Sequence, residues 1–144
     1  MKAIIGTNVI FAGLANRKGA AFKIFQHFFR GQFFWINSEE ILNEYEGVLS
    51  LSQKVSSLGC YIFLKLLQKR SMLVKIKGNF QVGKDADENK FLETAVIGDA
   101  DFLVTKNLKH FPRKRFQGMR IVNVAGFLKE IEKMLPEEFF GKYN

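Results

Sequence analysis

Cysteine is almost absent from this sequence: Cys60 is the single one among 144 residues. An internal disulfide is therefore excluded, and we expect a protein that works in a reducing compartment. Long apolar runs are also missing, since none approaches the roughly 18 residues of a membrane-spanning helix. Residues 1–5 lead into a turn rather than a signal peptide. These absences predict a cytoplasmic protein without a membrane segment.

Acidic residues are scarce relative to basic ones, 14 against 22, so the formal net charge is +8. A positive surface favours polyanionic partners, of which RNA is the first candidate, although a basic balance also serves solubility alone. The hydrophobic fraction of 47% and the charged fraction of 25% are typical of a globular domain, and 16 Phe residues predict an aromatic core. The length predicts one domain over residues 1–136, followed by a tail over 137–144.

Short apolar runs alternate along the chain with stretches of helical periodicity. The predicted strands span 3–5, 33–36, 73–76, 101–105 and 120–124. The predicted helices span 20–30, 38–49, 58–67, 85–96 and 125–135. Parallel strands joined by right-handed helical crossovers are the economical arrangement of such a sequence. The alternation therefore predicts an α/β fold, with a parallel sheet covered by helices on both faces.

Two details of the helices can be compared directly with a structure. The second predicted helix has Asn37 or Ser38 as its N-cap, and Glu40 is placed to complete a capping box with Asn37. Cys60, in the following helix, lies in an apolar setting and is expected to be at least half-buried.

Four passages, in this order and at this spacing, resemble the motifs of the PIN-domain family, in its branch of toxin-antitoxin toxins, the VapC-like ribonucleases. They are Ile4-Ile5-Gly6-Thr7-Asn8-Val9, Ser38-Glu39-Glu40-Ile41-Leu42-Asn43-Glu44-Tyr45, Asp85-Ala86-Asp87-Glu88-Asn89-Lys90-Phe91-Leu92-Glu93-Thr94-Ala95 and Ala100-Asp101-Phe102-Leu103-Val104-Thr105-Lys106-Asn107. Four collinear motifs are far more specific than any one short pattern. The resemblance implies a three-layer α/β/α sandwich with a short parallel sheet.

The resemblance also implies the positions of an acidic catalytic site. The family has an Asp before Thr-Asn in the first motif, a Glu in the second, an Asp at the helix start in the third and an Asp two residues after the Thr in the fourth. Those positions hold Gly6, Glu44, Glu88 and Asn107 here. Two of the four acids are absent and a third is lengthened, so the fold signature survives while the site signature is damaged.

The family's chemistry implies Mg²⁺ or Mn²⁺, which are hard cations held by carboxylate oxygens. Candidate ligands are Glu44, Glu88, Asp85 and Asn107, which can converge because ligand sites in open α/β sheets lie beyond the carboxyl ends of the strands. Each has a plainer interpretation. Asp85 and Glu88 can form a capping box, Glu44 can be a solvated helix residue, Asn107 can cap a short helix and Gly6 can be only a turn residue.

Other polar residues accompany these positions. Thr7, Asn8 and Thr105 match polar positions beside the family's acids, where they either orient ligands or make ordinary turn hydrogen bonds. Asp101 begins a strand instead of following one, so we expect it at the opposite edge of the sheet and exclude it from the site.

Basic residues crowd the segment after the fourth strand, and five of them are candidates for binding an RNA backbone: Lys106, Lys109, Arg113, Lys114 and Arg115. Arg120 belongs to the same basic stretch. Phe111 and Phe116 either stack on a splayed base or anchor a solvated loop to the core.

The resemblance therefore implies a metal-dependent endoribonuclease, the toxin half of a toxin-antitoxin pair, with RNA and a small antitoxin as partners and a possible homodimer. The substitutions at positions 6 and 107 predict weak or lost activity and leave open whether this chain cleaves RNA. The alternative is a non-catalytic PIN-like protein that binds RNA or an antitoxin. A third possibility is that Gly6 reflects an attenuated toxin.

Overall fold

The computed structural model describes residues 1–81, 86–111 and 114–136. Within them, strands form a six-stranded sheet in the order β3-β2-β1-β4-β6-β5. All neighbouring strands are parallel except β5, which is antiparallel to β6. The strands are β1 (Lys2–Ile5), β2 (Phe34–Asn37), β3 (Met72–Leu73), β4 (Phe102–Val104), β5 (Arg115–Phe116) and β6 (Met119–Val122). The predicted fold class is confirmed.

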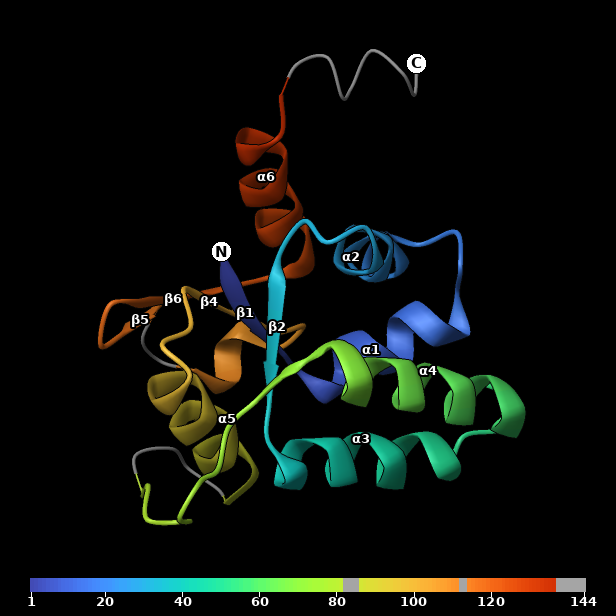
Figure 1. Ribbon diagram of the computed structural model, residues 1–144, viewed down its shortest axis with the longest axis horizontal. Coiled ribbons are helices and arrows are strands. Elements are labelled where there is room, and N and C mark those ends of the chain that lie inside the picture. Colours follow the sequence, from blue (N-terminus) through green and yellow to red (C-terminus); the bar gives the residue numbers. More distant parts are fainter. Residues whose placement is uncertain (82–85, 112–113, 137–144) are drawn as a thin grey trace.

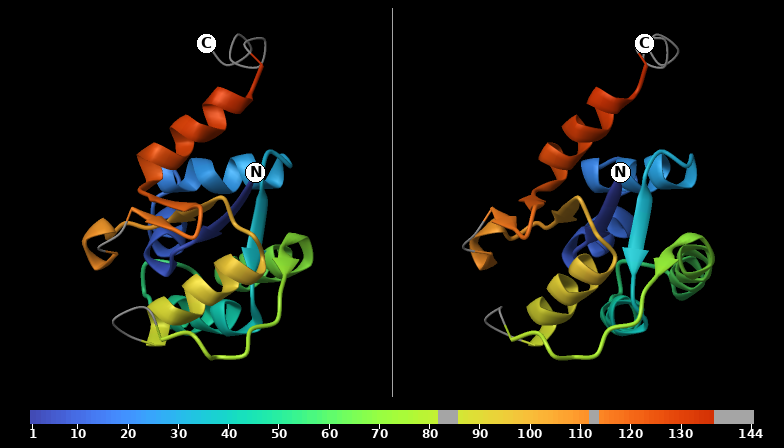
Figure 2. Two further views of the ribbon diagram at one scale, coloured as in Figure 1. Left: turned by 90° about the vertical axis from the view of Figure 1, so that its left-hand side faces the viewer. Right: turned by 60° about the vertical axis from the view of Figure 1, so that its left-hand side comes forward.

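Helices cover both faces of this sheet, and three layers result. They are α1 (Thr7–Ala15), α2 (Ala20–Phe29), α3 (Glu39–Ser50), α4 (Ser57–Arg70), α5 (Ala86–Ile97) and α6 (Val124–Met134), with a short 3-10 helix, η1 (Leu108–His110). Figures 1 and 2 show α5 on one face of the β1–β2 region and α1, α2 and α4 on the other. In Figure 1, α3 lies beyond the carboxyl end of β2.

The centre of the sheet brings together segments that are remote in sequence. In the β1–β4 pair, Ile5 is in register with Val104, so the carboxyl ends of both strands meet at the same edge. Each strand of the pair is buried along its apolar residues, as expected for a parallel strand covered on both faces. Residues that follow these two strands therefore become neighbours.

Aromatic side chains form much of the core, as the composition predicts. Trp35 of β2 is fully buried, and its ring stacks 6.0 Å from that of Phe25 and meets Phe28 edge-on at 5.2 Å. Phe63 of α4 contacts the same group, with its ring centroid 4.8 Å from that of Phe25. The face of β2 that carries Trp35 is thereby joined to two helices, because large aromatic rings bury much apolar area each.

The observed elements extend the predictions in several places. The helix α1 and the strand β5 were not among the predicted elements, and η1 was considered only as the short helix that Asn107 can cap. The third strand is only two residues long instead of the predicted 73–76, and Val74 ends the pairing with a backbone bond to Asn37. The predicted tail, 137–144, lies outside the described residues, so the domain boundary at 136 stays a prediction.

The capping prediction for α3 is resolved in favour of Ser38. Its hydroxyl accepts a hydrogen bond from the backbone N–H of Ile41 at 3.3 Å, and its backbone is extended as an N-cap requires. Asn37 is instead the last residue of β2, and its amide donates to the Ser71 hydroxyl at 2.8 Å. The proposed capping box from Asn37 to Glu40 was therefore wrong.

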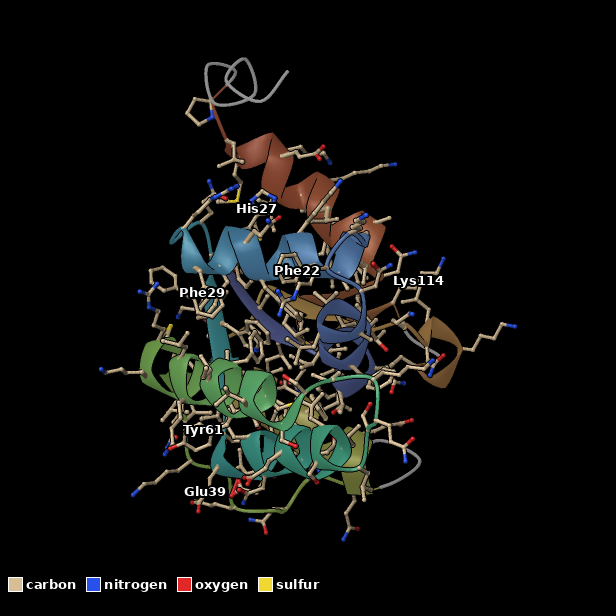
Figure 3. All side chains as sticks on the ribbon, turned by 90° about the vertical axis from the view of Figure 1, so that its right-hand side faces the viewer. Phe22, His27, Phe29, Glu39, Tyr61 and Lys114 are labelled. Atoms are coloured by element: carbon tan, nitrogen blue, oxygen red, sulfur yellow. The ribbon has the colours of Figure 1, made fainter. Side chains whose placement is uncertain are left out.

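The helix α4 buries one side and leaves the other exposed. Cys60 is buried, as predicted, together with Phe63 and Leu67, which follow it at helical spacing. Figure 3 shows Tyr61 of α4 and Glu39 of α3 in the same region of the surface, with Lys114 apart from them near η1. No helix within the described ranges has the length and hydropathy of a membrane span.

Candidate functional site

Gly6 lies at the edge where β1 and β4 end, and it is the N-cap residue of α1. Its backbone N–H donates to the Val104 carbonyl at 2.7 Å. A β-carbon at this position would lie 3.1 Å from the Val104 oxygen and 3.7 Å from Thr105 Cα. The φ angle of Gly6 is −65°, which any residue can adopt. A side chain at position 6 would therefore stand beside Thr105, in close but not forbidden packing.

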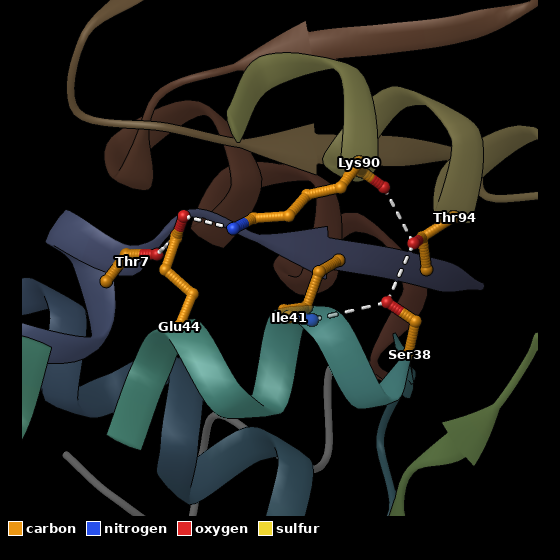
Figure 4. A network of polar contacts seen from close by, with 6 residues as sticks. All are labelled: Thr7, Ser38, Ile41, Glu44, Lys90 and Thr94. Atoms are coloured by element: carbon orange, nitrogen blue, oxygen red, sulfur yellow. Dashed lines mark hydrogen bonds and ion pairs between the residues drawn. The ribbon is translucent and has the colours of Figure 1, made fainter. Parts of the chain in front are cut away.

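Glu44 reaches this edge from α3 (Figure 4). One of its carboxylate oxygens accepts a hydrogen bond from the hydroxyl of Thr7, the residue that follows Gly6. The other carboxylate oxygen lies 2.8 Å from the ammonium of Lys90, on α5. The side chains of Glu44 and Lys90 keep only 16% and 21% of their exposure, so this ion pair is largely withdrawn from solvent. Three helices are thus joined through one carboxylate.

A second set of contacts fixes α5 against α3 (Figure 4). The hydroxyl of Thr94 donates to the Lys90 carbonyl at 2.7 Å and lies 3.0 Å from the Ser38 hydroxyl, with which it shares a hydrogen bond. Ser38 and Thr94 are fully buried. Because a buried hydroxyl without a partner is costly, these contacts hold the two helices in one relative position. Lys90 is thereby positioned through its backbone as well as its ammonium.

Glu88 lies in the first turn of α5, two residues before Lys90, and is half-buried. The structure thus places Glu88 on the helix whose Lys90 pairs with Glu44. That Glu88 and Glu44 share one site stays a prediction. The side chain of Asp85, the other acid proposed as a ligand near this turn, lies outside the described residues, and so does the capping box that it would form.

Thr105 and Asn107 complete the edge after β4. Thr105 is 8% exposed, and its hydroxyl accepts the backbone N–H of Asn107 at 3.0 Å. Asn107 occupies the N-cap position of η1 but makes no side-chain capping bond there. The alternative interpretation of Asn107, as a side-chain cap of a short helix, is therefore not borne out. Its amide is exposed beside the edge instead.

Tyr45 links α3 to the end of β1. Its hydroxyl donates a hydrogen bond to the carbonyl of Ile5, the last residue of β1, and the side chain is fully buried. Burial above all raises the pKa of this hydroxyl, and the neighbouring Glu44 charge raises it further. The hydroxyl therefore stays protonated and acts as a fixed donor between α3 and β1.

Asp101 lies at the opposite edge, as predicted. Its carboxylate accepts the backbone N–H of Lys2 at 2.8 Å, at the start of β1. Its carbonyl accepts the N–H of Arg120 at 3.0 Å, at the start of the neighbouring strand. These are contacts at the amino ends of the strands, so Asp101 has a structural role away from the candidate site.

The donors at the Gly6 edge do not fit a resident Mg²⁺ or Mn²⁺ ion. Gly6 supplies no side chain, Asn107 supplies only a neutral amide, and the Glu44 carboxylate already holds a hydroxyl and an ammonium. The Lys90 ammonium adds a positive charge that repels a second cation at short range. Among the residues that the structure describes, no three His, Cys, Asp or Glu side chains gather into a metal-binding group.

The basic residues after β4 divide into two kinds. Lys106, Lys109, Lys114 and Arg115 are exposed, as contact with a phosphate backbone requires, whereas Arg113 lies outside the described residues. Arg120 is engaged elsewhere: its guanidinium lies 2.9 Å from the Glu130 carboxylate and 5.4 Å from the Phe102 ring centre.

The two aromatic residues of this region pack inward. Phe111 and Phe116 are half-buried against the hydrophobic core. This favours their interpretation as anchors of a solvated loop over the alternative, stacking on RNA bases.

Three residues of the site region were missed by the sequence analysis. Lys90 and Thr94 make the contacts described above, and Glu93 is 3% exposed with its carboxylate accepting the backbone N–H groups of Lys77 and Gly78 at 2.6 and 3.1 Å. All three follow Glu88 within two turns of one helix. The sequence signal for them was that Glu93 and Thr94 stand between the apolar residues Leu92 and Ala95 of the predicted helix.

Comparisons with known proteins agree with this architecture. The PIN domain family matches residues 2–109 of the chain. An uncharacterized protein of Methanocaldococcus jannaschii, MJ1680, is 27% identical over 150 aligned positions, which cover 94% of each protein. The crystal structure of VapBC2 from Rickettsia felis, bound to a DNA fragment from its promoter, superimposes with a TM-score of 0.54 over 85% of this chain and 98% of the other, at 18% identity. The fold, the collinear motifs and the family match together place this chain in the PIN-domain family.

Proposed function

We propose that this chain is a toxin-type PIN-domain ribonuclease whose metal-dependent cleavage of single-stranded RNA is weak or lost. The observation that carries the proposal is the state of Glu44: its carboxylate is held by Thr7 and Lys90, while positions 6 and 107 contribute no carboxylate beside it. Affinity for hard divalent cations depends on the number of charged oxygen ligands. A site with this donor set is a poor centre for activating water.

We propose that the protein still binds RNA, although cleavage is weak or lost. Four exposed basic residues follow β4, at the end of the strand where the candidate site lies. Phosphate contacts by Lys and Arg give affinity that depends on salt and not on base sequence. The formal net charge of +8 supports the same preference for a polyanion.

The test is to restore the two missing acids. Gly6→Asp is compatible with the backbone at position 6, and Asn107→Asp changes the amide to a carboxylate of the same shape. We expect the doubly restored protein to cleave a mixed single-stranded RNA pool with Mn²⁺ at least about 100-fold faster than the chain as it stands, a usual magnitude for one catalytic group. A Gly6→Asn variant is the matched control, because it adds the same volume without charge.

Two outcomes would contradict this proposal. Equal cleavage by the unaltered and restored proteins, abolished in both by Glu44→Gln, would show that the site is intact. No cleavage and no thermal stabilisation by Mn²⁺ in the restored protein would show that this edge is not a nuclease site.

A second candidate function, a non-catalytic protein that binds a small antitoxin, is favoured by the exposed side of α4. Leu58, Ile62 and Leu66 are 69%, 49% and 42% exposed and recur every four residues, so they form one apolar stripe. Exposed apolar patches of this kind mark protein interaction surfaces. Antitoxin binding is implied by the family resemblance and is a proposal for this chain.

Co-expression with a candidate antitoxin tests that second function. Leu58→Glu with Ile62→Glu is expected to weaken the complex at least about tenfold, since two buried leucine-sized contacts are lost. Leu51→Glu, which changes an 86% exposed side chain after the end of α3, is the control. Light scattering of the unaltered protein alone distinguishes a homodimer that uses the same stripe.

A further inference from the structure

A cavity of about 650 Å³ opens beside the candidate site. Four residues of α1 line it, at positions 8, 11, 12 and 15, which lie on one side of the helix, and the C-cap residue Asn16 follows them. The opposite side of α1 is buried through Val9, Ile10 and Gly13. Lys106 and Asn107, the residues that follow Thr105, close another wall of the cavity. The cavity thus shares Asn107 with the edge where Gly6 and Thr105 meet.

The chemistry of this cavity combines an aromatic ring, amide groups and positive charge. Phe11 is half-buried and contributes apolar wall, and Asn8 and Asn107 contribute exposed amides. Within the described part of the chain, the side chains of Asn8, Lys106 and Asn107 have no hydrogen-bond partner. These donors and acceptors therefore remain available to a ligand.

The amino end of α2 forms a further wall through Gly19, Ala20 and Ala21. No side chain caps this end, and its first turn contains no acidic residue. The first backbone N–H groups of a helix attract anions when nothing else satisfies them. Arg17 and Lys18, which are exposed in the preceding loop, add positive charge. They are not part of the cavity wall, in which Lys106 is the charged side chain among the described residues.

We propose that this cavity binds one nucleotide of single-stranded RNA, with the base against Phe11 and a phosphate near Lys106 and the start of α2. The inference rests on the proposed function, since it names where RNA contacts the site. Its volume lies within the range of about 300–1,000 Å³ that small-molecule sites occupy. Bases splayed from a single strand are commonly held by an aromatic ring and by hydrogen bonds to their edges, as this combination provides.

Charge favours this cavity over a larger one between α3 and α4. Among the described residues that line the cavity beside Asn107, none is acidic. The other cavity, of about 790 Å³ between α3 and α4, is lined by Glu39 and Glu46 as well as by Lys65 and Lys75. Binding of a polyanion is favoured in the cavity without acidic residues, whereas the carboxylates of Glu39 and Glu46 repel it in the other.

The experiment measures binding of a fluorescent six-nucleotide RNA by anisotropy, without added divalent metal. Ala20→Asp places a negative charge at the start of α2, where it favours the helix through the dipole but repels a phosphate. We expect this variant to bind RNA at least about tenfold more weakly while its melting temperature stays equal or rises. Phe11→Leu and Lys106→Ala are expected to weaken binding as well. Gln68→Glu and Lys69→Ala, exposed changes on α4, are the matched controls and should leave binding unchanged.

The outcomes separate this inference from the proposed function. Unchanged RNA affinity in Ala20→Asp and Phe11→Leu, with loss in Lys109→Ala or Lys114→Ala, would overturn the cavity and leave RNA binding by the basic segment. Absence of RNA binding by the unaltered protein would also overturn it, while cleavage by the restored Gly6→Asp, Asn107→Asp protein would still decide the proposed function. Equal losses in the α4 controls would show a charge effect without a site.

Discussion

The ammonium of Lys90 lies 2.8 Å from the carboxylate of Glu44, so the acid that the second motif supplies to the candidate site is paired with a base supplied by the third. Both side chains are mostly withdrawn from solvent. Removing either partner would leave the other charge buried without compensation, which costs stability. The pair therefore links α3 to α5, and it also occupies the Glu44 carboxylate at this edge.

A double-mutant cycle with Glu44→Gln and Lys90→Met measures this relationship. Each single change also removes other contacts, so only the difference between the double and the summed single effects reports the pair. We expect a coupling of about 0.5–3 kcal/mol in the free energy of unfolding, measured by urea denaturation. Additive effects of the two changes would show that the ion pair contributes nothing to stability.

Gly13 and Gly47 provide a matched test of packing between helices. A β-carbon at Gly13 would lie 2.3 and 2.5 Å from two atoms of the Phe25 ring, whereas one at Gly47 would meet nothing within 4 Å. We expect Gly13→Ala to destabilise the protein by about 1–3 kcal/mol through overpacking. Gly47→Ala should stabilise it by about 0.5–1 kcal/mol, because alanine restricts the unfolded chain and favours the helix.

Thermal unfolding of both glycine variants gives the comparison. Gly13→Ala should cost less stability in a protein that already carries Phe25→Leu than in the unaltered protein, because the clashing ring is then absent. If Gly13→Ala proves as stabilising as Gly47→Ala, then α1 and α2 are not in close contact through Gly13 and Phe25.

Glu93 predicts a local effect on the segment before α5. Its buried carboxylate accepts the backbone N–H groups of Lys77 and Gly78. Because hydrogen bonds to a charged group are strong, we expect Glu93→Gln to cost about 1.5–3 kcal/mol of stability. Hydrogen exchange at these two amides should accelerate more than in Glu46→Gln, an exposed acid on α3. Unchanged protection of both amides would contradict the contact.

The Arg120–Glu130 pair predicts a dependence of stability on pH. The hydrogen bond from Arg120 lowers the pKa of the Glu130 carboxyl in the folded protein. A group with a depressed folded pKa stabilises the fold above its unfolded pKa of about 4.3, and this contribution is lost as the pH falls through the folded value. Glu130→Gln should therefore lower the melting temperature at neutral pH and have little effect in strong acid. A difference between the two proteins that grows on acidification would reverse this assignment.

Much of the site's position follows from the sequence because its physical basis is simple. Gly6 and Asn107 follow apolar runs typical of buried strands, and parallel neighbours end at the same edge. In the structure the Gly6 N–H bonds the Val104 carbonyl and the Asn107 N–H bonds the Thr105 hydroxyl, so both residues follow the ends of paired strands. The resemblance to the PIN-domain family supplied the remaining correspondence, which brought Glu44 to the same edge.

Other features depended on tertiary contacts that no local pattern reports. Lys90 pairs with a residue 46 positions earlier in the sequence, through the relative placement of two helices. The helix α1 has little contrast between its sides, since alanines and Phe11 line a cavity while Val9 and Ile10 enter the core. Helical periodicity alone therefore did not identify it. The two-residue strand β5 is defined by its hairpin with β6 and has no period to detect.

The β1–β4 pairing also determines when the site can form during synthesis. Ile5 and Val104 belong to opposite ends of a long intervening chain, and the entropy of closing such a loop must be overcome before their contacts are gained. Before β4 has been synthesised, the growing chain contains Gly6, Thr7 and Glu44. It does not yet contain Thr105 or Asn107. Most of the chain must therefore leave the ribosome before the edge that joins Gly6 to Thr105 exists.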